Sequence, residues 1–177
     1  LDAPILALEP YTRALSTGEV EPEDALKLAK ILSRRLPANE LGIFLTKISE
    51  TYDDTLSQES SLTLLTLKAA NALSMNDKER AMKLLSEVVS KDPLNGSALL
   101  TLGSYYIQEN ELEKALDYYD RASKVEAVKV DALLGATRIL VKRGKYLLAI
   151  NRLKEAQSIK EQYFVAEYIS TLEKFVN

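Results

Sequence analysis

The stretch TLGSYYIQENELEKALDYYDRA, residues 101–122, places small residues at regular positions inside apolar, helix-forming surroundings. Gly103 lies three residues before Tyr106. After a polar break, Ala115 lies four residues before Tyr119. A larger side chain at either small residue would force neighbouring helices apart, at a cost of about 1–3 kcal/mol. We therefore interpret Gly103 and Ala115 as the closest approach of two antiparallel helices.

This pattern recurs along the chain with a period of 34 residues. Self-similarity at such a period predicts stacked copies of one supersecondary unit. The turn residues of the pattern are Asn or Gly, which suit the left-handed conformation that ends a helix. The recurring sets are Ala81, Ala115 and Ala149; Leu85, Tyr119 and Leu153; Val88, Ala122 and Ala156; Leu65, Leu99 and Leu133; Ala69, Gly103 and Thr137; and the turn residues Asn76, Asn110 and Gly144.

Helical periodicity covers almost the whole chain. Only 6 glycines and 5 prolines occur, and good helix formers dominate. We expect helices at 3–16, 21–36, 39–56, 60–74, 77–91, 95–108, 111–125, 129–142, 145–158 and 161–176. The breaks at 17–18, 36–37, 76–77, 92–93, 109–110 and 143–144 are too short for domain linkers, and they predict turns between antiparallel helices. The sequence therefore predicts an all-α fold.

These residues resemble the tetratricopeptide repeat (TPR) family, whose 34-residue pattern is W-x2-L-G-x2-Y, then A-x3-F, then P. The repeat at 96–129 matches it with Leu102, Gly103, Tyr106, Ala115 and Tyr119. The repeat at 62–95 departs from it, with Lys68 and Ala72 at the Leu and Tyr positions. The repeat at 130–163 has Thr137 instead of glycine. The resemblance implies an α-solenoid, a right-handed superhelix of antiparallel helix pairs.

We expect residues 62–177 to form one continuous array of three TPR-like repeats plus a closing helix. Terminal elements of a solenoid must cover an otherwise exposed apolar face. At the end of the chain we expect the closing helix to turn Tyr163, Phe164, Ala166, Tyr168 and Ile169 towards the last pair.

Residues 1–61 fit the repeat less well, and we expect an N-terminal helical cap or a degenerate repeat there. Ala25, Ala29 and Pro37 suit the second helix of a pair that starts near Leu6. One additional helix, with Phe44 and Ile48, then intervenes before the regular repeats.

The composition argues against catalysis. The chain has no histidine and no cysteine, which removes the usual general base, the commonest metal ligand and thiolate chemistry. Carboxylate pairs such as Asp117 and Asp120 lie beside basic residues on predicted solvent faces. We therefore expect no enzyme activity, no catalytic residue, no metal site and no cofactor.

Nucleic acid and lipid are also poor candidates for the ligand. Of the 9 tyrosines, Tyr106, Tyr118, Tyr119 and Tyr146 fall at or near packing positions of the repeats, and the net charge is −3, so we expect no nucleic-acid binding. The chain has no apolar run approaching the roughly 20 residues that cross a bilayer, so we expect no direct membrane insertion of this chain.

The resemblance implies where a protein partner would bind. In this family the first helix of each pair lines a concave groove at the second, fifth, ninth and twelfth positions of the repeat. Carried over, these positions are Thr63, Thr66, Ala70 and Leu73; Ser97, Leu100, Ser104 and Ile107; and Asp131, Leu134, Arg138 and Val141. Such an apolar groove with a single cation suits a peptide segment with apolar anchors.

Two further readings of the groove follow from its residues. The Lys/Asn-rich clamp for acidic chaperone tails is missing, since Thr66, Ala70 and Leu134 stand at clamp positions. Alternatively, the groove residues only cover the inner helix surface, or contact a part of the protein absent from this chain.

The function expected from these patterns is a non-catalytic protein–protein interaction or assembly scaffold, with another protein or a peptide as partner. The alternative is a regulatory or substrate-recruiting domain of a larger enzyme whose catalytic part is not in this chain. Charge is uneven, with nine Lys or Arg against three Asp or Glu between residues 124 and 160, which is typical of solvated helix faces.

The sequence leaves the compartment and the oligomeric state open. The absence of cysteine fits a reducing compartment and equally an exported or envelope-anchored bacterial protein. Because the chain begins at Leu1 rather than at methionine, we expect it to be a processed or truncated piece.

Overall fold

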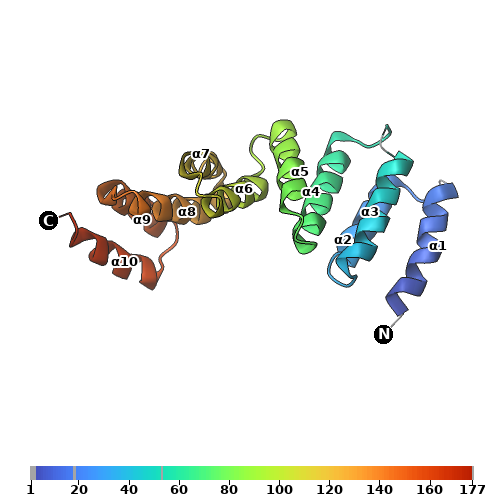
Figure 1. Ribbon diagram of the computed structural model, residues 1–177, viewed down its shortest axis with the longest axis horizontal. Helices are drawn as coiled ribbons and strands as arrows, with labels where there is room; N and C mark the ends of the chain where they lie inside the picture. The colour runs from blue at the N-terminus through green and yellow to red at the C-terminus, as the bar shows by residue number, and fades with distance from the viewer. Residues whose placement is uncertain (1–2, 18, 53, 177) are drawn as a thin grey trace. The chain divides into compact units, whose positions relative to one another are not determined.

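A computed structural model describes residues 3–17, 19–52 and 54–176 of the chain. Within these ranges it contains ten α-helices, one 3-10 helix and no strand, which confirms the all-α prediction (Figure 1). The elements are α1 (Ala3–Thr17), α2 (Pro22–Leu32), α3 (Ala38–Tyr52), α4 (Gln58–Ser74), α5 (Lys78–Lys91), α6 (Gly96–Gln108), α7 (Leu112–Ala122), η1 (Glu126–Val128), α8 (Lys129–Lys142), α9 (Tyr146–Ile159) and α10 (Tyr163–Glu173).

Most helices begin and end close to the expected residues, and the largest differences are at the end of α3, which stops at Tyr52 rather than at residue 56, and at the end of α2. This helix stops at Leu32 rather than at residue 36, and the next residues form turns. The backbone N–H groups of Arg35 and Leu36 both donate to the carbonyl of Leu32, at 2.9 and 2.8 Å. Pro37 disfavours helical geometry at Leu36, so the helix could not continue past that residue, and the turn hydrogen bonds to Leu32 end it four residues earlier.

The chain divides into two compact units, Leu1–Asp92 and Pro93–Asn177. In the first unit α2 contacts α3, α4 packs on both of them, and α5 packs on α4 (Figure 1). The core of this unit is formed by buried apolar side chains, with Leu15, Ala29, Phe44, Leu45 and Ile48 among them. The helix that carries Phe44 and Ile48, α3, contacts α1, α2 and α4.

In the second unit α6 pairs with α7, α8 pairs with α9, and α10 packs on α9. Val165 and Leu172 of α10 are buried in one cluster with Leu153, and Tyr168 and Ile169 pack against this cluster as expected. The expectation failed for Tyr163, Phe164 and Ala166, which are exposed. These three lie in the first turn of an 11-residue helix, and the face that meets the last pair runs through Val165, Tyr168, Ile169 and Leu172.

The turns of the repeats share one backbone geometry. Asn76, Asn110 and Gly144 are in the left-handed region, with φ of 59°, 59° and 68°. In each turn the next residue donates its N–H to the carbonyl five residues earlier, in the pairs Asp77 to Ala72 (2.9 Å), Glu111 to Tyr106 (2.8 Å) and Lys145 to Leu140 (2.8 Å). This is the hydrogen bond of a Schellman motif, which satisfies a carbonyl at the helix end. The turn role assigned to these residues is confirmed.

A tyrosine fills the joint between α6, α7 and α8. The side chain of Tyr119 is 5% exposed. A methyl group on Gly103 of α6 would lie 3.0 Å from Cε2 of this ring. One on Gly135 of α8 would overlap Cε1 and lie 2.6 Å from Cδ1. Gly103 is thus a packing device, as expected, but the group it makes room for is the Tyr119 ring, and Gly135 makes room on the ring's other edge.

Candidate functional site

The predicted groove residues of the first unit lie along α4. Thr63 and Thr66 are half-buried, and Ala70 and Leu73 are exposed. The hydroxyl of Thr66 donates to the carbonyl of Leu62 at 2.8 Å, so its proton is used within the helix. This part of the predicted surface is shallow and offers few polar groups to a ligand.

The predicted residues of the second unit lie on α6 and α8, which contact each other. The four apolar members, Leu100, Ile107, Leu134 and Val141, are half-buried, and the polar members, Ser97, Ser104, Asp131 and Arg138, are exposed. We refer to these eight residues as the α6–α8 surface. Leu134 and Val141 also pack against the cluster that α10 closes, so Leu100 and Ile107 supply most of its uncommitted apolar area.

A buried tyrosine adds a polar group beside this surface. The side chain of Tyr119, which comes from α7, lies close enough to Ser104 and Arg138 to interact with both. Burial raises the pKa of the Tyr119 phenol, and the charge of Arg138 acts against that rise. The sequence placed Tyr119 in the packing between helices but did not reveal that its hydroxyl reaches the same surface as Ser104 and Arg138. Gly135, which allows the ring to pass alongside α8, lies outside the 34-residue phase of Gly103 and gave no such signal.

Four of the nine cations between residues 124 and 160 are paired with acids of neighbouring helices. Arg152 lies 2.7 Å from Asp120, and Lys154 lies 3.2 Å from Glu173. The remaining pairs are Lys129 with Glu155 at 3.1 Å and Arg143 with Glu113. In contrast, the part of the chain that the structure describes contains no ion pair to Arg138. Part of the positive charge therefore connects neighbouring helices, and Arg138 is the cation that the α6–α8 surface offers to a ligand.

Solved structures with the same arrangement of helices identify the fold. MamA has a TM-score of 0.70 at 21% identity, over 88% of this chain and 87% of that chain. PilF of Pseudomonas aeruginosa has a TM-score of 0.65 at 16% identity, over 85% of this chain and 67% of that chain. The C-terminal part of a TPR repeat-containing protein from Cytophaga hutchinsonii has a TM-score of 0.70 at 9% identity, over 91% of this chain and 61% of that chain.

The chain has a tetratricopeptide-repeat fold. The expected helical-repeat architecture is therefore confirmed. No family model matches the sequence, and no curated protein matches it as a relative. In the TPR fold, α4, α6 and α8 are first helices of their pairs, which is where the groove residues were assigned.

Other chemistry is sparse on this TPR scaffold. Within residues 3–17, 19–52 and 54–176 no three acidic groups come together in a way that would hold a metal ion. Of the two carboxylates named above, Asp120 is in an ion pair with Arg152 at 2.7 Å. None of the helices described is both long and apolar enough to traverse a lipid bilayer.

Proposed function

We propose that the chain is a non-catalytic protein-interaction module that binds a peptide segment of a partner on the first helices of its repeats. The observation that carries the proposal is the α6–α8 surface. That surface combines half-buried apolar side chains with the hydroxyl groups of Ser104 and Tyr119 and with the guanidinium of Arg138, which has no ion pair among the residues that the structure describes. The residues proposed on α4, Thr63, Thr66 and Ala70, belong to the first unit and form a separate patch there.

The chemistry of the surface defines the ligand. Leu100 and Ile107 would accept apolar side chains of the peptide, as in other grooves lined by helices. Arg138 would pair with an acidic group that the neighbouring hydroxyls also contact. Burial of a few apolar anchors, at about 25 cal/mol per Å², supports only modest affinity once the peptide's ordering cost is subtracted. We expect micromolar rather than nanomolar dissociation constants for a short peptide.

A peptide-array or pull-down screen with charge-introducing variants tests the proposal. Leu100→Glu and Arg138→Glu should each abolish capture of partners that the parent protein binds. Leu147→Glu and Lys124→Glu are matched controls, because both residues are exposed in the same unit and lie outside the proposed site. If every captured partner bound Leu100→Glu and Arg138→Glu as well as the parent, the α6–α8 surface would not be the site.

The absence of catalysis is a separate part of the proposal. A screen of the purified protein against hydrolase, transferase and redox substrates should detect no turnover. Turnover that disappears when one carboxylate is neutralised would contradict it.

A further inference from the structure

The first unit contains a groove that the proposed function does not use. Its volume is about 620 Å³, and it is lined by α3, α4 and the first turn of α5, with one residue from α1. Binding pockets for small molecules and peptide side chains usually have volumes of about 300–1,000 Å³. Its residues on α4 include Lys68, Asn71 and Met75. By helical geometry these lie on roughly the opposite side of α4 from Thr63, Thr66 and Ala70.

Asn71 places an unsatisfied acceptor in the wall of this groove. The residue is 7% exposed, and its Oδ1 has no hydrogen-bond partner. Its Nδ2 reaches only the sulfur of Met75, at 3.7 Å, and a thioether is a weak acceptor. Buried carboxamide oxygens are nearly always hydrogen-bonded in folded proteins. The unfilled acceptor therefore marks a position where a ligand's N–H would fit.

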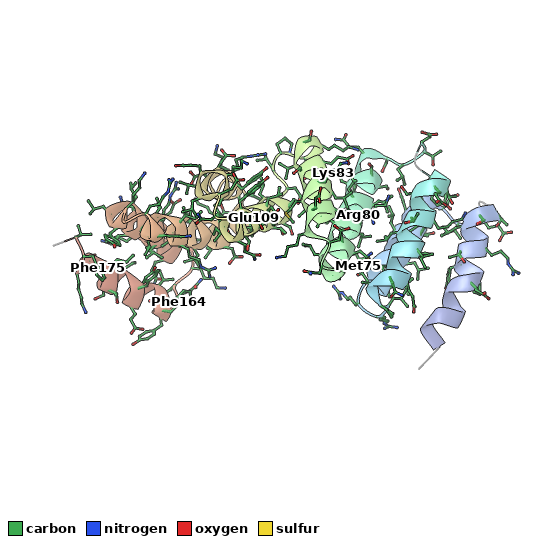
Figure 2. All side chains as sticks on the ribbon, in the orientation of Figure 1. Met75, Arg80, Lys83, Glu109, Phe164 and Phe175 are labelled. Atoms are coloured by element: carbon green, nitrogen blue, oxygen red, sulfur yellow. The ribbon has the colours of Figure 1, made fainter. Side chains whose placement is uncertain are left out.

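The rim of the groove combines apolar surface with a free cation. Ile43 is 68% exposed and Met75 is 52% exposed, although both are large apolar residues. Arg80, in the first turn of α5, forms no ion pair within the ranges that the structure describes. The other lining charges are committed to partners. Lys47 lies 3.9 Å from Glu50, Lys68 donates to Ser49 at 2.7 Å, and Asp77 caps α5. Met75 and Arg80 flank the turn between α4 and α5 (Figure 2).

We propose that this groove is a second peptide-binding site, whose ligand is a segment of a partner protein with an apolar side chain next to an acidic one. The apolar side chain packs between Ile43 and Met75. The acidic side chain pairs with Arg80, and a backbone N–H of the segment donates to Oδ1 of Asn71. This site shares no residue with the α6–α8 surface, so either proposal can fail without the other.

The probe is a phage-displayed library of short random peptides, panned against the full chain. The chain has 2 methionines, Met75 on the rim and Met82, which is buried and does not line the groove. Methyl-labelled methionine therefore gives an NMR spectrum with one reporter and one internal control. Enriched peptides should combine an apolar and an acidic residue, and should shift the Met75 signal while leaving the Met82 signal in place.

Two variants and one control complete the experiment. Asn71→Leu and Arg80→Glu should each weaken binding of these peptides by at least about tenfold. Lys83→Glu makes the same charge change on α5 outside the groove, and it should leave affinity unchanged (Figure 2). Leu100→Glu should also have no effect on them. The proposal is overturned if panning enriches nothing, if the enriched peptides leave Met75 unshifted, or if they bind Arg80→Glu as tightly as the parent.

Discussion

The two units solve the same packing problem differently where one helix pair meets the next. At the joint of α7 and α8, the ring of Tyr119 occupies the space beside Gly135. At the joint of α3 and α4, Gly42 faces the carboxamide of Asn71, whose Nδ2 would lie 3.0 Å from a methyl group added there. The first joint is filled by an aromatic ring. The second is occupied by a short polar side chain and opens into a groove of about 620 Å³.

This difference shows that a glycine between two packed helices does not always have the same structural role. Beside Tyr119, the glycine makes room for a group that is already there, so the joint is complete. Beside Gly42, the side chain of Asn71 has open space next to it and an oxygen without a hydrogen-bond partner. A complete joint stabilises the unit, whereas an incomplete one leaves surface for a ligand. The predictions below test this contrast.

The largest effect is expected from enlarging the glycines beside Tyr119. Gly135→Leu and Gly103→Leu should each lower the free energy of unfolding by about 3 kcal/mol, because the ring is confined on both edges. Ala115→Phe, at a position that is 0% exposed, should have a similar effect. Urea denaturation measures the change. Urea denaturation curves equal to that of the parent would show that the side chains around Tyr119 are loosely packed and that the repeat register is wrong.

Replacement of Asn71 should have a smaller effect of the opposite sign. Asn71→Leu removes a buried acceptor without a partner and keeps nearly the same shape, so we expect the unit to become about 1 kcal/mol more stable. The matched control is Thr137→Val. The hydroxyl of Thr137 is satisfied by the carbonyl of Leu133 at 2.8 Å, so that change should not stabilise. A clear loss of stability in Asn71→Leu would mean that its carboxamide supports the fold rather than a ligand.

Gly42→Ala should be nearly neutral or slightly stabilising. Alanine is favoured over glycine inside a helix by about 0.5–1 kcal/mol, and Asn71 can move away into the groove. Gly135→Ala, in contrast, should be destabilising, since Tyr119 has nowhere to move. Thermal unfolding of both variants gives the comparison directly. A destabilisation of equal size in the two would remove the distinction between a filled and an open joint.

The smallest effect concerns the dependence of stability on pH in the acidic range. The hydrogen bond from Arg143 holds the pKa of the Glu113 carboxyl below its usual value, and the charges of Arg143 and Lys145 act in the same direction. A lowered folded-state pKa gives stability that is present above the unfolded pKa, near 4.5, and is lost as the pH falls through the folded pKa. The Tm of Glu113→Gln should therefore lie slightly below that of the parent at pH 7, and the gap should close in acid. A constant gap across this range would contradict the assignment.

The regular part of the fold could be predicted because its signals are local and repeated. The 34-residue recurrence placed small residues at Ala81, Ala115 and Ala149, and all three are 0% exposed in the structure. Asn110 and Gly144 could be assigned to turns because few residues tolerate a left-handed backbone. These positions depend on backbone conformation and size alone, which a sequence records directly.

The remainder depends on contacts between distant residues that the repeat does not impose. Gly135 lies outside the glycine phase of the pattern, so nothing in the sequence connected it with Tyr119. In the sequence, Asn71 looks like any polar residue of an amphipathic helix. It is the packing of α3 on α4 that buries it. The groove residues on α4, α6 and α8 stay a prediction about ligand binding.

The position of Tyr119 also allows the rotation of its ring to report on motions of the helices in the second unit. Gly103 lies beside Cε2 and Gly135 beside Cε1, so a half-turn of the ring requires both helices to move outwards together. The ring of Tyr163, which is 86% exposed, turns without such an opening. The rate at which the two edges of Tyr119 exchange therefore reports the frequency of a collective motion of α6, α7 and α8 that a static structure does not display.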